Sequence, residues 1–196
     1  MFAGDTQVSI EMIRPDLDAL PAPVWPSDHH VRRYQPGDEA YWHDIHVRAD
    51  RYNDHRPEWF EREFGRDAAL LAQRQLYLVG PGGEVIGTST AWMDADATGR
   101  VHWIAVVPEA QGRGLGRALL LATCHRLAEL GHRRARLTTQ TPRLAAINLY
   151  LDVGFLPRPR NDRELAAWRA LGAHVRPGLR PGLESALAEG EEGSGR

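Results

Sequence analysis

The feature that most constrains this chain is a change of periodicity within one short run. The run begins with VHWIAVV, from Val101 to Val107, and its β-branched and aromatic residues are typical of a strand packed on both faces. Pro108 then ends the strand, because it has no N–H to donate to a neighbouring strand. Three glycines within five residues follow, and the segment RALLLA after them has high helix propensity. The sequence therefore predicts a strand, a glycine-rich loop and a helix in succession.

The glycine-rich loop is suited to holding an anion. Glycines leave the backbone accessible, and the first amides of a helix point outward at the positive end of its dipole. A phosphate is the natural ligand of such a loop. A nucleotide-triphosphate loop would need Gly-Lys-Ser/Thr, and the chain contains no lysine. The dinucleotide pattern GxGxxG would need its third glycine where Arg117 or Leu119 stands. Both of these common motifs are therefore excluded.

The loop reads Gln-x-x-Gly-x-Gly, with Gln111, Gly114 and Gly116 at the fixed positions. This pattern resembles the (Arg/Gln)-x-x-Gly-x-(Gly/Ala) signature of the GNAT acetyltransferase superfamily. A second segment, AAINLYLDVGF from Ala145 to Phe155, is similar to the family's A-x-x-L-Y-x-x-x-G-F stretch between a helix and a strand. The resemblance covers roughly residues 31–157 and implies that the loop amides bind the pyrophosphate of coenzyme A.

Composition excludes several classes of partner. The formal charge is −2, and the 24 basic residues, all arginine, are scattered, which argues against a nucleic-acid surface. No apolar run approaches the ~18 residues of a membrane span, and residues 1–10 lack the features of a signal peptide. The single cysteine, Cys124, excludes an internal disulfide. We expect a cytoplasmic protein without a nucleic-acid or membrane partner, and a homodimer is left open.

The expected elements alternate between strands and helices, which gives the α/β class. Strands are expected at residues 31–34, 76–79, 84–92, 101–107 and 135–139. Asp38 and Thr141 are expected to cap two helices, and Pro57 to start another. The resemblance implies a single-domain GNAT-like mixed sheet, with antiparallel N-terminal strands and a parallel pair at its centre, flanked by helices.

Three segments are predicted along the chain. Residues 1–30, with four prolines, form an N-terminal arm that is irregular or contains one short strand. Residues 31–158 form the GNAT-like acyltransferase domain. Residues 159–196 contain one amphipathic helix and a disordered tail rich in Gly, Pro and Glu.

Two side chains are candidates for catalysis. The family often places a glutamate on the central strand, but Arg100 aligns with that position. His102 lies two residues further, on the same strand face, and its ordinary pKa near 6.5 suits a general base. Tyr150 aligns with the tyrosine that the family offers as general acid, and a hydrogen bond to the leaving sulfur is its safer role because a phenol is less acidic than a thiol.

The resemblance also implies a set of residues that bind the cofactor. A backbone N–H near Val106 or Val107 would stabilise the oxyanion, and Asn148 would contact the pantetheine arm. The complete predicted cofactor set is Val106, Val107, Gln111, Gly112, Arg113, Gly114, Leu115, Gly116, Arg117 and Asn148. No metal site is predicted, because His43, His46 and His55 have a spacing that fits no compact ligand set.

The resulting hypothesis is an N-acetyltransferase that moves an acetyl group from acetyl-CoA to an amine by direct attack. The acceptor, a small molecule or a peptide, is not identified. Residues 42–64 would cover its pocket, and Asp94 and Asp96 could bind a cationic acceptor. The alternative is a non-catalytic acyl-CoA-binding or regulatory domain, which Arg100 keeps open. A third hypothesis is an unrelated phosphate-binding α/β module.

Overall fold

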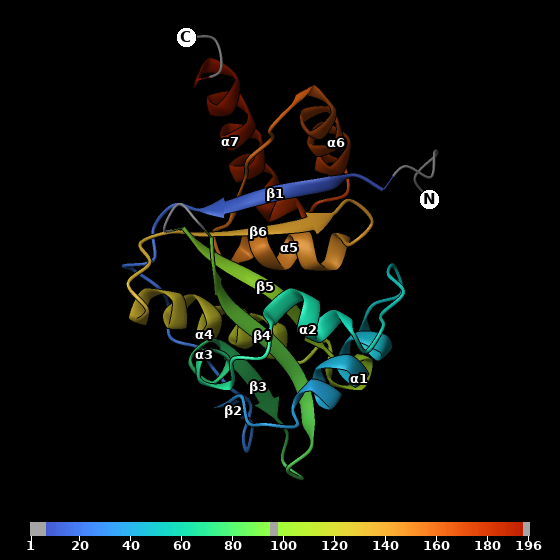
Figure 1. Cartoon of the computed structure of the whole chain (residues 1–196). Helices are drawn as coiled ribbons and strands as arrows, with labels where there is room; N and C mark the ends of the chain where they lie inside the picture. The colour runs from blue at the N-terminus through green and yellow to red at the C-terminus, as the bar shows by residue number, and fades with distance from the viewer. Residues whose placement is uncertain (1–6, 95–97, 194–196) are drawn as a thin grey trace. The chain divides into compact units, whose positions relative to one another are not determined.

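The computed structural model describes residues 7–94 and 98–193, and the chain divides into two compact units. The central unit consists of Leu17–Arg133, and the terminal unit combines Met1–Asp16 with Arg134–Arg196. In Figure 1, the blue strand and the orange and red helices belong to the terminal unit. Asp96, a predicted acceptor contact, lies outside the described residues.

The central unit contains a four-stranded antiparallel sheet (Figure 1). Its strands lie in the order β2 (His30–Arg33), β3 (Gln75–Val79), β4 (Val85–Met93) and β5 (Gly99–Val106). The strands expected near residues 31–34, 76–79, 84–92 and 101–107 are confirmed with shifts of a residue or two. A turn rich in Gly and Pro joins β3 to β4 into the expected hairpin.

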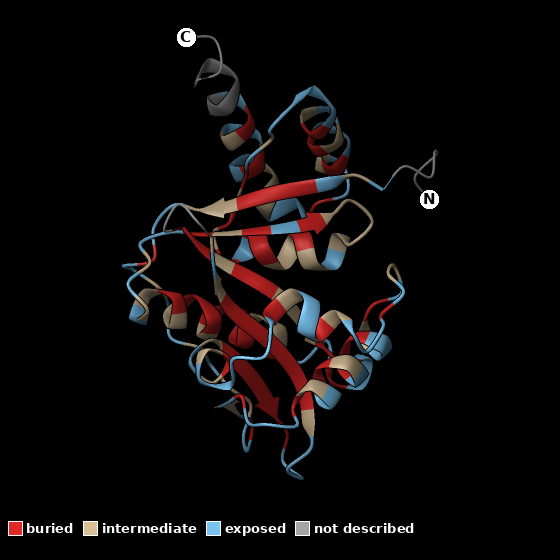
Figure 2. Ribbon diagram, in the orientation of Figure 1, coloured by how far each residue is buried: buried red, intermediate tan, exposed pale blue. Residues whose placement is uncertain are grey.

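Helices pack on this sheet through two separate clusters. The helices are α1 (Glu39–Ala49), α2 (Trp59–Phe64), α3 (Ala68–Arg74), the short η1 (Pro108–Ala110) and α4 (Leu115–Glu129). Leu76 and Leu78 of β3 join the cluster that contains Leu115 and Leu119 of α4. Tyr77 belongs instead to an aromatic cluster with side chains of α1 and α2. Alternate residues of a strand point to opposite faces, so α4 and this aromatic cluster lie on opposite sides of β3. Figure 2 shows β3 and β4 largely in red, as expected for strands that have a neighbour on each side.

Asp38 does not cap α1 with its side chain, although it occupies the N-cap position. Its carboxylate instead accepts two hydrogen bonds from Arg32, at 2.6 and 2.8 Å, and one from the Gln35 N–H at 2.7 Å. The prediction of a side-chain cap was therefore wrong. An arginine on the preceding strand competes for the same oxygens, and a charged hydrogen bond is stronger than a neutral one.

The terminal unit is built from both ends of the chain. Its strand β1 (Ser9–Arg14) pairs antiparallel with β6 (Ala135–Gln140) along its whole length and with β7 (Leu156–Pro157) on its other side. Helices α5 (Leu144–Asp152), α6 (Asp162–Gly172) and α7 (Arg180–Gly193), with the short η2 (Pro177–Leu179), complete the unit (Figure 1). The short strand allowed within residues 1–30 is thus present.

Two local expectations in the terminal unit differ from the structure. Thr141 does not cap α5, which begins at Leu144; its hydroxyl accepts a hydrogen bond from the Val8 N–H at 3.2 Å. Residues 180–193 form a helix where composition predicted disorder. Leu183 and Leu187, one helical turn apart, are both buried, so this stretch has the apolar face that its overall composition concealed.

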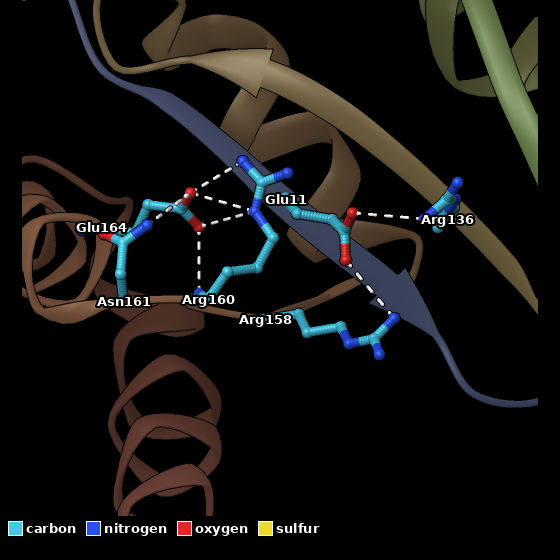
Figure 3. Close-up of polar contacts among 6 residues, drawn as sticks. All are labelled: Glu11, Arg136, Arg158, Arg160, Asn161 and Glu164. Carbon is cyan, nitrogen blue, oxygen red and sulfur yellow. Dashed lines mark hydrogen bonds and ion pairs between the residues drawn. The ribbon is translucent and has the colours of Figure 1, made fainter.

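Two buried carboxylates of the terminal unit, Glu11 and Glu164, each bind arginines, and Figure 3 shows both groups. Glu11 on β1 pairs with Arg136 at 3.6 Å and Arg158 at 3.3 Å. Glu164 on α6 accepts from the Arg160 guanidinium at 2.7 and 2.9 Å. Burial alone would raise the pKa of Glu164, but its hydrogen bonds with Arg160 outweigh burial and lower it. Both carboxylates are about 5% exposed or less, so the arginines compensate charges that water cannot reach.

Within the described part of the chain, none of the helices combines the length and apolar character needed to cross a bilayer.

Candidate active site

The glycine loop joins β5 to α4 as the sequence predicts. Pro108 begins the short helix η1, and α4 starts at Leu115 with Gly114 as its N-cap. Gly112 and Gly114 have φ angles of 75° and 80°, a region that disfavours side chains. A Cβ built on either glycine would meet no described atom within 4 Å. The glycines are therefore required by backbone conformation, and open space lies beside them.

This loop presents a positive electrostatic field to that space. Among the described residues, no side chain caps the N-terminus of α4 and no acidic residue stands in its first turn. The first amides of a helix lack partners within the helix and carry the positive end of its dipole. Arg113 is exposed beside them. The loop therefore fits the phosphates of a ligand such as coenzyme A, with residues 112–117 as the natural donors.

The side chain of Gln111 is part of the loop's framework. Its Nε2 donates to the carbonyl oxygen of Val106 at 2.8 Å, which ties the loop to the last residue of β5. Buried Leu115 holds the other end of the loop in the core. Gln111 and Leu115, both predicted to bind the cofactor, thus also hold the two ends of the loop in place.

The two predicted oxyanion donors are not equivalent. The Val107 N–H donates to the Ile86 carbonyl of β4 at 2.9 Å, so it already has a partner. Successive N–H groups of a strand point to opposite sides, and the N–H of Val106 therefore faces away from β4. The oxyanion role of either N–H stays a prediction.

His102 lies on β5 and is hydrogen-bonded to a carboxylate. Its Nε2 is 3.2 Å from Oε2 of Glu63 on α2, and His102 as a whole residue is 8% exposed. The ring contacts Phe64 edge-on, with centroids 5.5 Å apart. Burial lowers the pKa of His102 below its ordinary value, although the bond to Glu63 acts in the opposite direction. The imidazole is therefore neutral at pH 7 and can accept a proton.

Glu63 is the charged member of this pair. Its hydrogen bond with His102 is the main cause that lowers the pKa of Glu63 to about 2, with a further contribution from Trp103 and opposition from burial. The carboxyl is thus ionised throughout the neutral range, and a neutral imidazole faces a carboxylate. The sequence did not reveal Glu63, because it stands 39 positions before His102 and no local pattern joins the two.

A β-bulge in β5 places His102 and Trp103 beside the same carboxylate. Thr88 pairs with Ala105 and Thr90 with His102, so two residues of β5 stand opposite one of β4. Trp103 has a φ of 50°, which is uncommon for a bulky residue. Its indole Nε1 donates to Glu63 Oε2 at 3.1 Å. The bulge explains how adjacent residues of one strand bind one acceptor.

Tyr150, the second predicted catalytic residue, lies on α5 in the terminal unit. It is buried, and its ring meets Phe155 edge-on with centroids 6.2 Å apart. Burial raises the pKa of Tyr150 to about 12, with Arg143 acting weakly in the opposite sense. The phenol therefore keeps its proton. Full transfer to an ordinary thiolate would be uphill by about 5 kcal/mol, so the chemistry favours hydrogen-bond donation.

Asn148 is occupied within the terminal unit. Its Nδ2 donates to the Leu144 carbonyl at 2.9 Å, and its Oδ1 accepts from the Arg176 N–H at 2.8 Å. The side-chain amide thus connects α5 to the segment before η2. These contacts use one of the two N–H groups of Nδ2, and the predicted bond to a pantetheine arm stays a prediction.

His46 and His55, two of the three histidines of residues 42–64, are buried. His46 Nδ1 lies 2.8 Å from the Trp42 carbonyl, and burial lowers the pKa of His46 to about 4. His55 Nε2 is 2.9 Å from Asp50 Oδ2, and both side chains are buried. Searched over its described residues, the chain holds no group of three or more His, Cys, Asp or Glu arranged to bind a metal. The rings of His46 and His55 both contact the ring of Trp103, the residue at the β5 bulge. Residues 42–64 therefore support the bulge.

Comparison with known proteins gives consistent family evidence. The model of the acetyltransferase (GNAT) family matches residues 40–155. A mycothiol acetyltransferase from Thermobispora bispora is 32% identical over 74% of this chain and 52% of its own length. One from Nocardia farcinica is 31% identical over 70% of this chain and 48% of its own length. The chain spans about half the length of the curated relatives it matches.

Solved structures share the fold. A GCN5-related N-acetyltransferase from Sphaerobacter thermophilus aligns with a TM-score of 0.66 and 24% identity, over 76% of this chain and 48% of that one. The spermidine N-acetyltransferase from Vibrio cholerae aligns with a TM-score of 0.52 and 18% identity, over 66% of this chain and 80% of that one. The predicted α/β class and GNAT-like fold are confirmed. With the loop from Gln111 to Gly116 inside the matched region, this chain belongs to the GNAT acetyltransferase family.

Proposed function

We propose that this chain transfers an acetyl group from acetyl-CoA to an amine. The observation that carries the proposal is the glycine loop, whose positive-φ glycines and uncapped helix start are suited to bind phosphate in a member of this family. Gln111 and Leu115 hold this loop in place. The chain covers only half of its curated relatives, so their activity supports the proposal without establishing it.

The roles of the side chains follow from their protonation states. Acetyl-CoA supplies the thioester that the amine attacks. An alkyl amine has a pKa of roughly 10, so its proton must be removed as it reacts. His102 is neutral and adjacent to a carboxylate, which suits it to take this proton. Tyr150 keeps its proton and is suited to donate a hydrogen bond to the leaving sulfur.

The acceptor is proposed to be a small amine. Curated relatives are named for mycothiol and a structural neighbour is named for spermidine, which suggests compounds of these two classes as acceptors. Both therefore belong in an acceptor panel, together with peptide N-termini. A cytoplasmic location is part of the proposal. A homodimer is to be tested by light scattering.

The experiment incubates the protein with acetyl-CoA and each amine and measures the release of free thiol. Thiol release that depends on one class of amine is the expected result. A rise in melting temperature with coenzyme A but no transfer to any amine would instead favour a non-catalytic acyl-CoA-binding domain. No thermal shift with coenzyme A would contradict the proposed cofactor.

A further inference from the structure

One carboxylate oxygen connects two adjacent residues of β5 to helix α2. Oε2 of Glu63 is 3.2 Å from Nε2 of His102 and 3.1 Å from Nε1 of Trp103. The Glu63 side chain is 23% exposed and that of His102 is 10% exposed, so water competes little for this bond. The arrangement is built by the β-bulge, without which His102 and Trp103 would face opposite sides of the strand.

We propose that Glu63 is a positioning residue that holds His102 with its proton on Nε2 and its lone pair on Nδ1. This inference rests on the proposed function, in which Nδ1 would take the proton of the acceptor amine. An ionised carboxylate only accepts hydrogen bonds, so the ring nitrogen that faces it must be the donor. Among the described residues, Glu63 is the hydrogen-bond partner of the imidazole. Nδ1 is thus the nitrogen that remains for proton transfer.

The same carboxylate also supports the backbone that carries His102. Trp103 has a positive φ, and such a conformation persists only where the surroundings hold it. Its indole is fixed by the bond to Glu63 and by ring contacts with Trp42 and His55, at centroid distances of 5.3 and 5.6 Å. Glu63 therefore orients both the imidazole and the strand from which the imidazole projects.

The charges around His102 set the direction of the expected pH effect. Arg100 on β5 lowers the pKa of His102, whereas Glu63 and Asp94 raise it against the dominant effect of burial. On α2, Arg62 pairs with the other oxygen of Glu63 at 3.2 Å. Removing the charge of Glu63 removes one of the groups that raise the pKa of His102, while burial and Arg100 still lower it. The imidazole therefore becomes a weaker base and is protonated at a lower pH.

The first test measures the His102 tautomer directly in the full chain. Long-range ¹⁵N–¹H spectra distinguish protonated Nε2 from protonated Nδ1, and the His102→Gln spectrum identifies the signal among the nine histidines. We expect the Nε2–H tautomer in the parent and in Glu63→Gln, whose amide oxygen can still accept both bonds. We expect a mixture or the Nδ1–H tautomer in Glu63→Ala. A pure Nε2–H tautomer in Glu63→Ala would overturn the proposal.

The second test measures the pH dependence of acetyl transfer. For Glu63→Gln we expect the acid limb of kcat to move about one pH unit lower, with a loss in plateau kcat of roughly three- to tenfold. For Glu63→Ala we expect a loss of about tenfold or more, with KM for acetyl-CoA unchanged. Glu61→Gln is the matched control, because Glu61 lies on the same helix, is exposed and pairs with Arg66. This control should retain the parent profile.

The two proposals fail in different ways. If the parent transfers acetyl groups and Glu63→Ala keeps the parent kcat and pH profile, the role of Glu63 is wrong and the proposed function stands. A lower melting temperature for Glu63→Ala without a change in either tautomer or pH profile would likewise overturn it. If the parent transfers to no amine, the proposed function fails, and the tautomer spectra still decide whether Glu63 orients His102.

Discussion

The side-chain amide of Gln111 donates to the backbone carbonyl of Val106, with 2.8 Å between Nε2 and the oxygen. Gln111 begins the glycine loop and Val106 ends β5, so this bond closes the loop against the strand that precedes it. The loop's shape therefore depends on a side chain as well as on its glycines. It also explains why a long side chain with an N–H donor suits this position.

The first prediction tests this closure. Gln111→Ala should weaken acetyl-CoA binding about tenfold, because the loop loses a hydrogen bond worth about 1 kcal/mol and becomes mobile in the free protein. Gln111→Arg keeps a long donor and should bind nearly as well as the parent. Isothermal titration calorimetry measures both variants. Equal affinities for the parent and Gln111→Ala would show that the bond does not shape the site.

The second prediction tests the positive electrostatic field at the N-terminus of α4. Gly114 is a poor position for substitution because its φ of 80° would strain any side chain, whereas Gly116 lies within α4. Gly116→Glu should abolish coenzyme A binding, because it places a carboxylate among the phosphate donors. Its melting temperature should not fall, since an acidic residue is favourable in the first turn of a helix.

Gly116→Gln is the matched control for this substitution, because it has the same bulk without the charge. Its affinity for coenzyme A should lie between those of the parent and Gly116→Glu. If both variants bind as the parent does, the phosphates lie elsewhere.

The third prediction concerns the base. His102→Ala should lower kcat by roughly 10²-fold at pH 7, and the loss should shrink at high pH where the amine deprotonates unaided. Affinity for acetyl-CoA should be unchanged. Steady-state kinetics from pH 6 to 10 with one identified acceptor measure the effect. Parent-like activity at pH 7 would assign proton removal to water or to another group.

The fourth prediction concerns Tyr150. Tyr150→Phe retains the ring and its contact with Phe155, so acetyl-CoA affinity should be unaffected. The variant should raise the barrier by about 1–3 kcal/mol, which is roughly a 5- to 150-fold loss in kcat. In the parent, the raised pKa of about 12 means that no alkaline loss of activity from this phenol should occur below pH 11. A fully active Tyr150→Phe would leave the tyrosine with a packing role only.

The fifth prediction is a pH dependence of stability. The pKa of His46 is lowered to about 4 in the folded protein, so between pH 6.5 and 4 the unfolded state binds more protons than the folded state. The free energy of unfolding should therefore fall as the pH drops through this range, with about 3 kcal/mol from His46. Urea denaturation at several pH values measures it.

Two variants isolate the contribution of His46 from the other titrating groups. His46→Gln should be less stable than the parent at pH 7 but should show a shallower loss towards pH 4. His30→Gln, an exposed control on β2, should keep the parent slope. Identical slopes for the parent and His46→Gln would mean that His46 titrates normally.

The sequence predicted best what depends on local chemistry. The run from Val101 through Gly116 predicted strand β5, the glycine loop and the start of α4. Each of these has its own typical residues: β-branched residues for the strand, glycines for the loop and helix-forming residues for the helix. The Leu149-Tyr150 and Gly154-Phe155 pairs likewise identified the end of α5. What the sequence could not show was pairing between distant residues. Glu63 meets His102 only once α2 packs on the sheet, and no residue type signals the bulge at Trp103.

The expectations that failed have two causes: other partners bind the two expected caps, and composition conceals a buried helix face. Asp38 and Thr141 both had the right chemistry for helix caps, but Arg32 and the Val8 N–H bind them instead. Residues 180–193 looked disordered by composition, yet Leu183 and Leu187 give them a buried face. The four-residue spacing of these two leucines could have predicted the helix, but composition alone does not record spacing.

The pairing of β1 with β6 has a consequence for the order of events during synthesis. Gln140, the partner of Ser9, leaves the ribosome 131 residues after it. At about 5–20 residues per second, the first strand waits on the order of ten seconds for the strand that it must join. The contact order of the terminal unit is correspondingly high, and closing so long a loop is slow. An emerging chain would therefore complete its central unit first, while the edge of β1 remains open to chaperones or to other nascent chains.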